Sequence, residues 1–226
     1  MNIKAIVTDI EGTTSSIDFV HTVLFPYSSQ AIPEYIRQYY QEPEIAAIIE
    51  DIKIEVGQEN LNIESVIDTL LGWIEADLKI TPLKKLQGLI WEDGFNKGKF
   101  KGHIYEDAYQ NLQKWRDRGL SLYVYSSGSE QAQKSLFGHT EYGNLNVLFS
   151  GYFDTRIGNK KESLSYTKIA REIKIEPQEI LFLSDVVAEL DAAANARYQT
   201  ILLVRDRMPE NTNNHQIVNN FNEIKI

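Results

Sequence analysis

The sequence predicts an α/β fold, a Rossmann-like parallel sheet whose first strand is followed by an all-helical insertion. Short apolar runs rich in β-branched residues alternate with segments of helical periodicity, which is the pattern of a parallel sheet with helices on both faces. The long stretch between the first two runs has a helical pattern and no strand signal. The predicted strands lie at residues 3–8, 120–125, 180–183 and 200–204, and the helices among them at 104–118, 130–137, 166–173 and 189–197.

The insertion is predicted from its hydrophobic periodicity. The run from Ile63 to Leu78 carries apolar residues three and four positions apart, which predicts an amphipathic helix. A second such run covers 43–55, and a third begins near Pro82, a residue suited to the first helical turn. The expected organisation is a catalytic α/β core of residues 1–17 and 102–226, with a helical cap of residues 18–101.

The composition excludes several classes of protein. The 226 residues include no cysteine, so thiol nucleophiles, disulfides and cysteine-ligated metal centres are excluded. With 23 Lys and Arg against 32 Asp and Glu, the net charge of −9 argues against nucleic-acid binding. It does not argue against a phosphorylated substrate, which is bound by local charge. No segment approaches the roughly 18 apolar residues of a membrane span, so we expect a cytoplasmic protein with no membrane partner.

Polar residues follow the predicted strands at the point where each strand ends. Asp9 and Glu11 come after the first strand, Ser126 and Ser127 after the second, and Asp185 after the third. Ligands of open parallel sheets bind beyond the carboxyl ends of the strands, so we expect these side chains to lie close together. Two carboxylates spaced two residues apart suit a nucleophile or metal ligand beside a proton carrier.

Each member of this set also has an ordinary structural explanation. Asp9 and Glu11 could be a turn aspartate and a surface glutamate, and Asp185 could cap a helix, as could the serines. Lys160 and Lys161 precede a predicted helix, and either could neutralise a phosphate or be a solvated charge. Taken together, the carboxylates, hydroxyls and lysine favour a phosphate site with Mg²⁺ shared by Asp9 and Asp185.

The order of these motifs resembles the haloacid dehalogenase-like hydrolase superfamily over essentially the whole chain, with the helical insertion in the place of its cap. Within that superfamily, the motifs are most similar to the enolase-phosphatase family of methionine salvage. That family has Glu at the position of Glu11, where the wider superfamily usually has Asp. The similar blocks are Thr8–Ile17, Phe19–Val20, Leu24–Tyr27, Gly102–Tyr105, Tyr125–Ser129, Gln133–Gly138, Phe153–Thr155, Lys160–Tyr166 and Phe182–Asp185.

The resemblance implies a monomeric, Mg²⁺-dependent hydrolase of a small phosphorylated diketo substrate, 2,3-diketo-5-methylthiopentyl-1-phosphate, which is enolised and then dephosphorylated to the acireductone. It implies that Asp9 forms an aspartyl phosphate and that Glu11 protonates the leaving oxygen and then activates water. It also implies that Lys160 orients the nucleophile and the phosphate. By the same resemblance, the metal ligands are Asp9, Glu11 through its backbone carbonyl, and Asp185, and the phosphate is bound by Ser126, Ser127 and Lys160.

Some assignments have alternatives. The base that enolises the substrate is Glu11 or His103, and Glu11 is favoured because a lone histidine is more often structural. Phe19, Phe25 and Tyr27 could contact the methylthio tail of the substrate, although a role in the packing of the cap is favoured. The alternative functions are a generic Mg²⁺-dependent small-metabolite phosphatase and a non-catalytic binding protein on the same fold.

Overall fold

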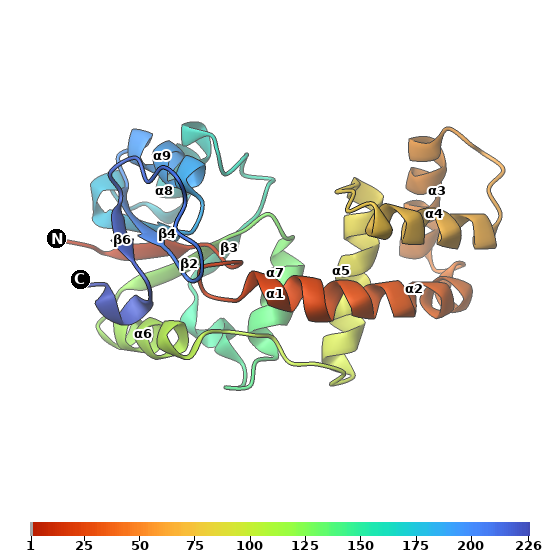
Figure 1. The fold of residues 1–226 in the computed structure, drawn as a ribbon, viewed down its shortest axis with the longest axis horizontal. Coiled ribbons are helices and arrows are strands. Elements are labelled where there is room, and N and C mark those ends of the chain that lie inside the picture. The colour runs from red at the N-terminus through yellow and green to blue at the C-terminus, as the bar shows by residue number, and fades with distance from the viewer. Residues whose placement is uncertain (1) are drawn as a thin grey trace. The chain divides into compact units, whose positions relative to one another are not determined.

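The chain forms two compact units. In the computed structural model, which describes residues 2–226, the first unit comprises the N-terminal segment up to Ile17 together with Lys101–Ile226, and the second is Asp18–Phe100. The first unit carries the sheet, and the second is helical (Figure 1). The roles of catalytic core and cap stay a prediction, because compactness shows where units divide and not what each does. No helix among residues 2–226 is long and apolar enough to cross a membrane.

The first unit is built on a six-stranded parallel sheet, which confirms the predicted fold class. Its strands are β1 (Ala5–Thr8), β2 (Ser121–Tyr125), β3 (Gly151–Phe153), β4 (Ile180–Ser184), β5 (Gln199–Leu203) and β6 (Gln216–Val218). The strand order is β3-β2-β1-β4-β5-β6, so the first strand of the chain lies in the middle of the sheet. The chain therefore builds one half of the sheet with β2 and β3 and then crosses to the other half for the remaining strands.

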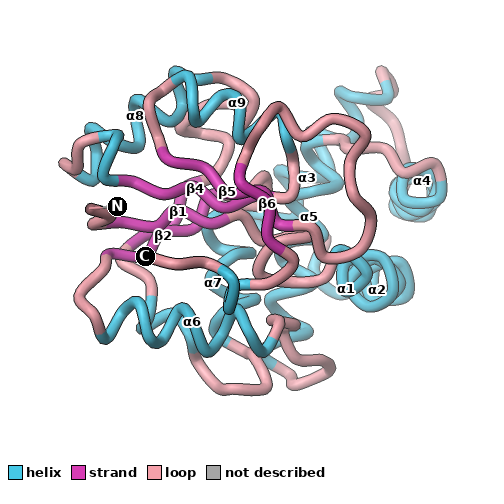
Figure 2. Tube along the Cα trace, turned by 60° about the vertical axis from the view of Figure 1, so that its left-hand side comes forward, coloured by secondary structure: helices cyan, strands magenta, loops and turns pink. Residues whose placement is uncertain are grey.

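Four helices cover the sheet, namely α6 (Glu106–Asp117), α7 (Glu130–Gly138), α8 (Ser163–Ile173) and α9 (Val187–Asn195). Figures 1 and 2 show α8 and α9 on one face, with α6 and α7 on the opposite face. On the α8–α9 face, Ala5 and Val7 of β1 pack with the fully buried Tyr166 and Phe182. All four residues of β1 are buried, as expected for a central strand covered on both faces. Short 3-10 turns η2 (Leu145–Leu148), η3 (Pro177–Glu179) and η4 (Phe221–Glu223) complete the unit.

The strands β3 and β6 lie outside the predicted set. Each has three residues, too few to show the two-residue alternation that identifies a strand in a sequence. They form the two edges of the sheet. The interior strands were predictable because their longer apolar runs are buried on both faces.

The second unit is helical, as the periodicity of 18–101 predicts. A continuous helical segment, α1 (Ile17–Phe19), the π-helical η1 (Val20–Leu24) and α2 (Phe25–Tyr39), leads into α3 (Pro43–Val56), α4 (Ile63–Glu75) and α5 (Thr81–Asn96). The core of this unit consists of isoleucine, leucine and valine side chains from α2 to α5. At the start of α4, the Asn62 side chain accepts the Ser65 N–H at 2.9 Å, which caps the helix.

Helix α4 ends at Glu75, earlier than the predicted end at Leu78. Asp77 adopts the left-handed conformation, with φ of 50°, and the N–H of Leu78 bonds back to the carbonyl of Trp73 at 2.9 Å. This turn closes the helix in the manner of a left-handed C-cap. Leu78 consequently leaves the apolar face of the helix and is 45% exposed.

The Asn-rich C-terminal segment is attached to the first unit by the β5–β6 pairing and by buried side chains that include Phe221. This side chain is fully buried, and its ring stacks on Trp115 of α6 with 5.4 Å between ring centroids and 26° between ring planes. Ile217 of β6 belongs to the same segment but is 37% exposed. Val218 and Ile224 of the segment are buried as well, and Phe221 is its largest fully buried side chain.

Phe221→Ala should lower the free energy of unfolding by about 3–5 kcal/mol, because it removes a large buried side chain and leaves a cavity beside Trp115. Ile217→Ala should lower it by less than about 1 kcal/mol, because Ile217 is partly in solvent. Urea denaturation followed by tryptophan fluorescence measures both values. Equal losses for the two variants would contradict the packing role assigned to Phe221.

Candidate active site

Asp9 lies directly beyond the central strand of the sheet. Thr8, the last residue of β1, faces Val124 of β2 and Leu183 of β4, and the N–H of Asp9 bonds to the Leu183 carbonyl at 2.9 Å. The order of strand addition reverses beside β1, which is where open α/β sheets bind their ligands. Asp9 is 3% exposed, so its carboxylate is buried at this point.

A tight turn follows Asp9 and lies against Asp185, the residue after β4. The carbonyl of Ile10 accepts the N–H groups of residues 13–15 at 2.9 to 3.1 Å. Gly12 has φ of +70°, a conformation that other residues rarely adopt, and a Cβ at this position would overlap the carboxylate of Asp185. Glycine is therefore needed both for the turn and for the close approach of the two strand ends.

The side chain of Lys160 joins the acidic groups of the site. Its Nζ lies 2.6 Å from Oδ1 of Asp9 and 2.7 Å from Oε2 of Glu189, and all three side chains are buried. Burial by itself lowers the pKa of Lys160, but the charges of Asp9 and Glu189 outweigh it and raise the pKa above its ordinary value. The ammonium group is therefore charged. The neighbouring Lys161 is exposed, so the buried position belongs to Lys160.

Glu189 is a member of the cluster that sequence reasoning missed. It begins the alanine-rich stretch 189–197, whose pattern indicates a helix and nothing more. In the structure its Oε2 also accepts the hydroxyl of Ser184 at 3.0 Å. Burial and the charge of Asp9 raise the pKa of Glu189, while Lys160 opposes the rise. Its position in the sequence could have indicated this role. Glu189 lies in the first turn of a helix that begins just after a strand, and a side chain there can reach back to the end of that strand.

Three hydroxyl groups fix the loop that carries Lys160. The hydroxyls of Tyr125, Ser165 and Tyr166 donate to the carbonyls of the three consecutive residues 158–160 at 2.7 to 2.9 Å. A lysine has a long and flexible stem, so its ammonium group is placed only as well as its backbone is held. The hydroxyls therefore position Lys160 against Asp9.

Glu11 lies beside Ser126, whose hydroxyl donates to Oε2 of Glu11 at 3.4 Å. Burial and the charge of Asp9 raise the pKa of Glu11, so this carboxyl keeps its proton to a higher pH than a free glutamate. Ser126 is fully buried directly after β2, and its Oγ accepts the Gly128 N–H at 3.2 Å. Ser127, the other predicted phosphate ligand, is exposed on the same loop.

Asp185 follows β4 and lies against the turn after β1. Its Oδ1 is buried and has no hydrogen-bond partner among the described residues. Burial and the charge of Asp9 raise the pKa of Asp185 to about 7. A buried carboxylate oxygen without a partner is unfavourable unless a cation compensates its charge.

Acidic groups outnumber basic ones in the cluster. Four carboxyl groups, those of Asp9, Glu11, Asp185 and Glu189, lie around the single ammonium group of Lys160. When ionised, this excess of negative charge repels an anionic phosphate. The unpartnered oxygen of Asp185 and the all-oxygen donor set fit a hard divalent cation such as Mg²⁺. Within residues 2–226, no three His, Cys, Asp or Glu side chains are grouped so that they alone could hold a metal ion.

The side chain of His103 contacts the residues at the end of the turn that follows Asp9. Its Nδ1 accepts the Ser16 N–H at 3.0 Å and lies 3.2 Å from the hydroxyl of Ser15. Burial lowers the pKa of His103, which favours the neutral ring that this contact requires. The engaged Nδ1 is not available to take a proton from a substrate. Of the two bases that the sequence leaves open, the geometry favours Glu11.

The aromatic side chains proposed to contact a substrate tail pack within the helical unit. The ring of Phe25 stacks on Trp91 with 6.1 Å between centroids, and Tyr27 meets Phe100 edge to face at 4.8 Å. Phe19 is partly buried at the end of α1. These contacts support the packing role that the sequence favours for Phe25 and Tyr27.

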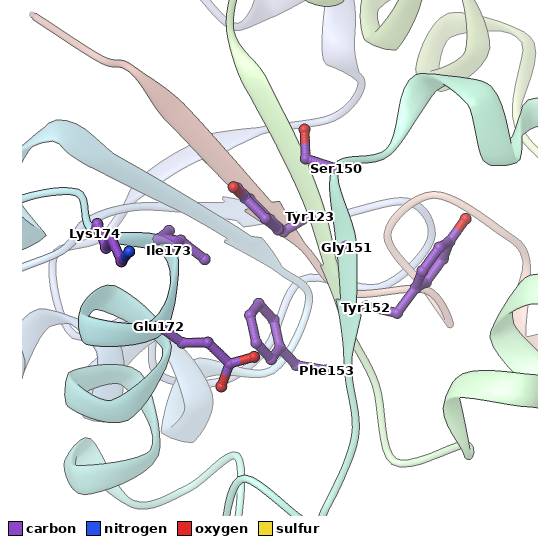
Figure 3. A pocket seen from close by; sticks show the side chains of 8 residues that line it. All are labelled: Tyr123, Ser150, Gly151, Tyr152, Phe153, Glu172, Ile173 and Lys174. Atoms are coloured by element: carbon purple, nitrogen blue, oxygen red, sulfur yellow. The ribbon is translucent and has the colours of Figure 1, made fainter.

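A separate cavity of about 350 Å³ lies beside the edge strand β3 (Figure 3). Figure 3 shows the rings of Tyr123 and Phe153 on the sheet side and Glu172 and Lys174 at the end of α8. The two charged residues are exposed, and no lining residue belongs to the polar cluster. The chemistry is therefore assigned to the strand-end cluster and not to this cavity.

The sequence and the fold were compared with known proteins. A family model described as haloacid dehalogenase-like hydrolase matches residues 3–197. The chain is also similar in fold to the UTR4 protein of Saccharomyces cerevisiae, with a TM-score of 0.82 and 33% identity, over 99% of this chain and 100% of that one. The matched residues include Asp9, Lys160 and Asp185, so the family similarity covers the polar cluster.

Curated relatives narrow the family. The enolase-phosphatase E1 of Sulfurihydrogenibium sp. is 54% identical to this chain, over 99% of this chain and 98% of the relative. That of Thioalkalivibrio sulfidiphilus is 52% identical over 96% of this chain and 97% of the relative. The chain therefore belongs to the haloacid dehalogenase-like hydrolase family and, within it, to the enolase-phosphatases.

Proposed function

We propose that this enzyme enolises 2,3-diketo-5-methylthiopentyl-1-phosphate and then hydrolyses the enol phosphate to the acireductone and inorganic phosphate. The similarity to enolase-phosphatases supports the choice of substrate. The observation that carries the chemistry is the buried carboxylate of Asp9 at the end of the central strand, with the Lys160 ammonium 2.6 Å away. A buried nucleophile beside a fixed cation suits phosphoryl transfer, which depends on positioning and charge stabilisation.

In the first phosphoryl transfer, a carboxylate oxygen of Asp9 attacks phosphorus and the bond from phosphorus to the substrate oxygen breaks. The N–H of Ile10 and the ammonium of Lys160 both bond to Oδ1 of Asp9, at 2.8 and 2.6 Å, and so fix the plane of the carboxylate. Glu11 gives its proton to the departing oxygen. The raised pKa of Glu11 keeps that proton in place until it is needed.

In the second transfer, water attacks the aspartyl phosphate and the bond from phosphorus to Asp9 breaks. Glu11 has lost its proton in the first step, so it can now take one from the attacking water. The same residue thus serves as acid and then as base, and Asp9 is regenerated as a carboxylate. Inorganic phosphate is the product.

Lys160, Ser126 and Ser127 are the proposed ligands of the phosphate group. The ammonium of Lys160 is charged and also pairs with Glu189 at 2.7 Å, which holds it beside Asp9. Ser126 lies at the end of β2 with its hydroxyl near Glu11, and Ser127 follows it on the exposed part of the loop. Hydroxyl donors at a strand end can bind phosphate oxygens without adding negative charge.

Mg²⁺ is the proposed cofactor. Asp9, Asp185 and the backbone carbonyl of Glu11 would hold it, and it would supply positive charge to offset the carboxylates and the phosphate oxygens. The buried unpartnered oxygen of Asp185 supports this assignment. So does the cradle at Gly12, where the absence of a side chain brings the backbone against Asp185.

In enolisation, the base removes a proton from the carbon next to a carbonyl group, and the carbonyl oxygen takes a proton from water. Glu11 is the proposed base, because His103 already uses Nδ1 to accept the Ser16 N–H. Glu11 must be ionised for this step and protonated for the next one. Taking the substrate proton leaves it in the form that the phosphoryl transfer requires.

The substrate assignment is tested by adding the diketo phosphate to the purified enzyme with Mg²⁺ or with EDTA. Phosphate and acireductone should form together with Mg²⁺ and not with EDTA. Turnover of other phosphate esters but not of the diketo phosphate would refute the substrate.

Asp9→Asn should lower turnover by at least about 10⁴-fold, because the amide cannot act as the nucleophile. The unfolding midpoint of this variant should stay close to that of the parent. Near-normal turnover by the variant would refute the nucleophile.

Glu11→Gln should abolish both reactions, because a single carboxyl group serves as base for enolisation and as acid for phosphate release. We expect losses of about 10²-fold or more in each, measured by proton exchange at the substrate carbon and by phosphate release. His103→Asn is the matched control and should retain proton exchange. Continued exchange in Glu11→Gln, with loss in His103→Asn, would transfer the role of base to His103.

Asp185→Asn should stabilise the metal-free protein at alkaline pH. Folding raises the pKa of Asp185 from 3.8 to about 7, so the stability that its proton provides is complete below the unfolded value and is lost as the pH rises towards 7. Asparagine carries no charge and avoids this loss. At pH values above 7 and without metal, we expect the variant to be more stable than the parent by about 1–2 kcal/mol.

Mg²⁺ should reverse this order, because it stabilises the parent and binds the variant poorly. Asp117→Asn, which changes an exposed carboxylate of α6, should show neither effect. Thermal unfolding across pH with and without Mg²⁺ measures all three proteins. An Asp185→Asn variant that is less stable than the parent in EDTA at alkaline pH would contradict the account of Asp185.

A further inference from the structure

Arg205 makes a dense set of contacts that the proposed reaction does not use. It follows β5, and its guanidinium lies 4.0 Å from the ring centroid of Tyr105 and 5.4 Å from that of Phe221. Its Nη1 bonds to both carboxylate oxygens of Asp107 at 2.9 Å. Its Nε and Nη2 both donate to the carbonyl of Thr13, at 3.2 and 2.9 Å. The Arg205 side chain is 8% exposed, so these contacts are largely shielded from water.

The carbonyl that Arg205 binds belongs to the turn that carries the proposed catalytic carboxylates. Thr13 is two residues after Glu11 and directly after Gly12. The N–H of Thr13 bonds to the Ile10 carbonyl at 3.1 Å, inside the turn, so Arg205 holds the same peptide segment from outside. A shift of this carbonyl would change the direction of Glu11 and the approach of Gly12 to Asp185.

Arg205 is itself fixed by rigid parts of the first unit. Asp107 lies in the first turn of α6, and its Oδ2 also accepts the Phe221 N–H at 2.7 Å. Next to it, the Tyr105 N–H bonds to the Thr14 carbonyl at 2.9 Å. The guanidinium therefore links β5, α6 and the C-terminal segment to one carbonyl oxygen of the turn. A planar fork that binds a carboxylate, a carbonyl and a ring at once cannot be replaced by the ammonium of a lysine.

We propose that Arg205 is a positioning residue for the turn 10–15, acting through the Thr13 carbonyl to hold Glu11 and the Asp9 loop in their reactive arrangement. This inference rests on the proposed phosphatase chemistry of Asp9 and Glu11. It assigns Arg205 no contact with substrate. Its loss should therefore lower kcat and leave KM nearly unchanged, because the phosphate ligands Ser126 and Lys160 lie on other loops.

The test compares Arg205→Ala, Arg205→Lys and Asp107→Asn with the parent enzyme. We expect kcat to fall by about 100-fold in Arg205→Ala, the loss that a misplacement near 1 Å produces, with KM changed by less than about threefold. Arg205→Lys should recover only a small part of kcat. Guanidinium ion, added far below denaturing concentrations, should restore activity to Arg205→Ala by filling the space between Tyr105 and Thr13, and should not restore Asp107→Asn.

The matched control is Arg37→Ala. Arg37 also forms a two-bond pair with a carboxylate, at 2.9 and 2.6 Å from Glu64, but it lies on the exposed surface of the helical unit. This variant should keep the parent kcat and show no effect of guanidinium. Unchanged kcat in Arg205→Ala, or a loss that appears only in KM, would overturn the proposal. So would a loss of kcat without guanidinium rescue.

A measurement that does not depend on catalysis tests this inference separately from the proposed function. Amide hydrogen exchange in the peptide that spans residues 10–15 should be faster in Arg205→Ala than in the parent and unchanged in Arg37→Ala. Exchange that is equally slow in all three proteins would overturn the positioning role. If the parent enzyme hydrolyses a different phosphate ester and not the diketo phosphate, the substrate proposal fails, and the same kcat comparison is made with the ester that it does hydrolyse.

Discussion

The buried contact of Lys160 with Asp9 and Glu189 is the interaction on which the rest of the site depends. A lysine can stay charged in the interior only where carboxylates replace its lost hydration, and those carboxylates need the lysine for the same reason. Asp9 follows β1, Glu189 lies in α9 and Lys160 comes from the loop after β3. Three segments far apart in the sequence meet because the parallel sheet directs all of its strand ends to one edge, with β1 at the centre.

The charge of this cluster also explains its chemistry. One ammonium group does not neutralise four carboxyl groups, and burial together with the charge of Asp9 raises the pKa values of Glu11 and Asp185. For Glu11, a raised pKa favours the protonated carboxyl group that the proposed reaction uses as its acid. For Asp185, it supports the proposed cation site, because a divalent cation there would replace the proton that the carboxyl group otherwise retains. The net negative charge of the protein is therefore compatible with a phosphorylated substrate, because the charges at the strand ends, and not the net charge, determine what the site attracts.

The sequence predicts the parallel sheet and most of the cluster because both leave local signals. Asp9, Ser126 and Asp185 each terminate an apolar run, and strand ends of a parallel sheet converge. Glu189 was missed because it lies in a helical pattern, and its role comes from the direction of one side chain in the first turn. The strand β3 was too short to show alternation, and Asp77 ended α4 by a left-handed turn that hydrophobic periodicity does not reveal. Arg205 was unpredictable for a related reason, since a carbonyl oxygen is a partner that leaves no trace in the sequence.

The central claim is that Asp9 receives the phosphoryl group. Borohydride reduces an acyl phosphate to an alcohol, so adding it during turnover would convert a phosphorylated aspartate into homoserine. Mass spectrometry of the peptide that contains residue 9 should then show homoserine in place of Asp9, only when substrate and Mg²⁺ are both present. Continued release of phosphate with Asp9 unreduced, while another carboxylate is converted, would contradict the account.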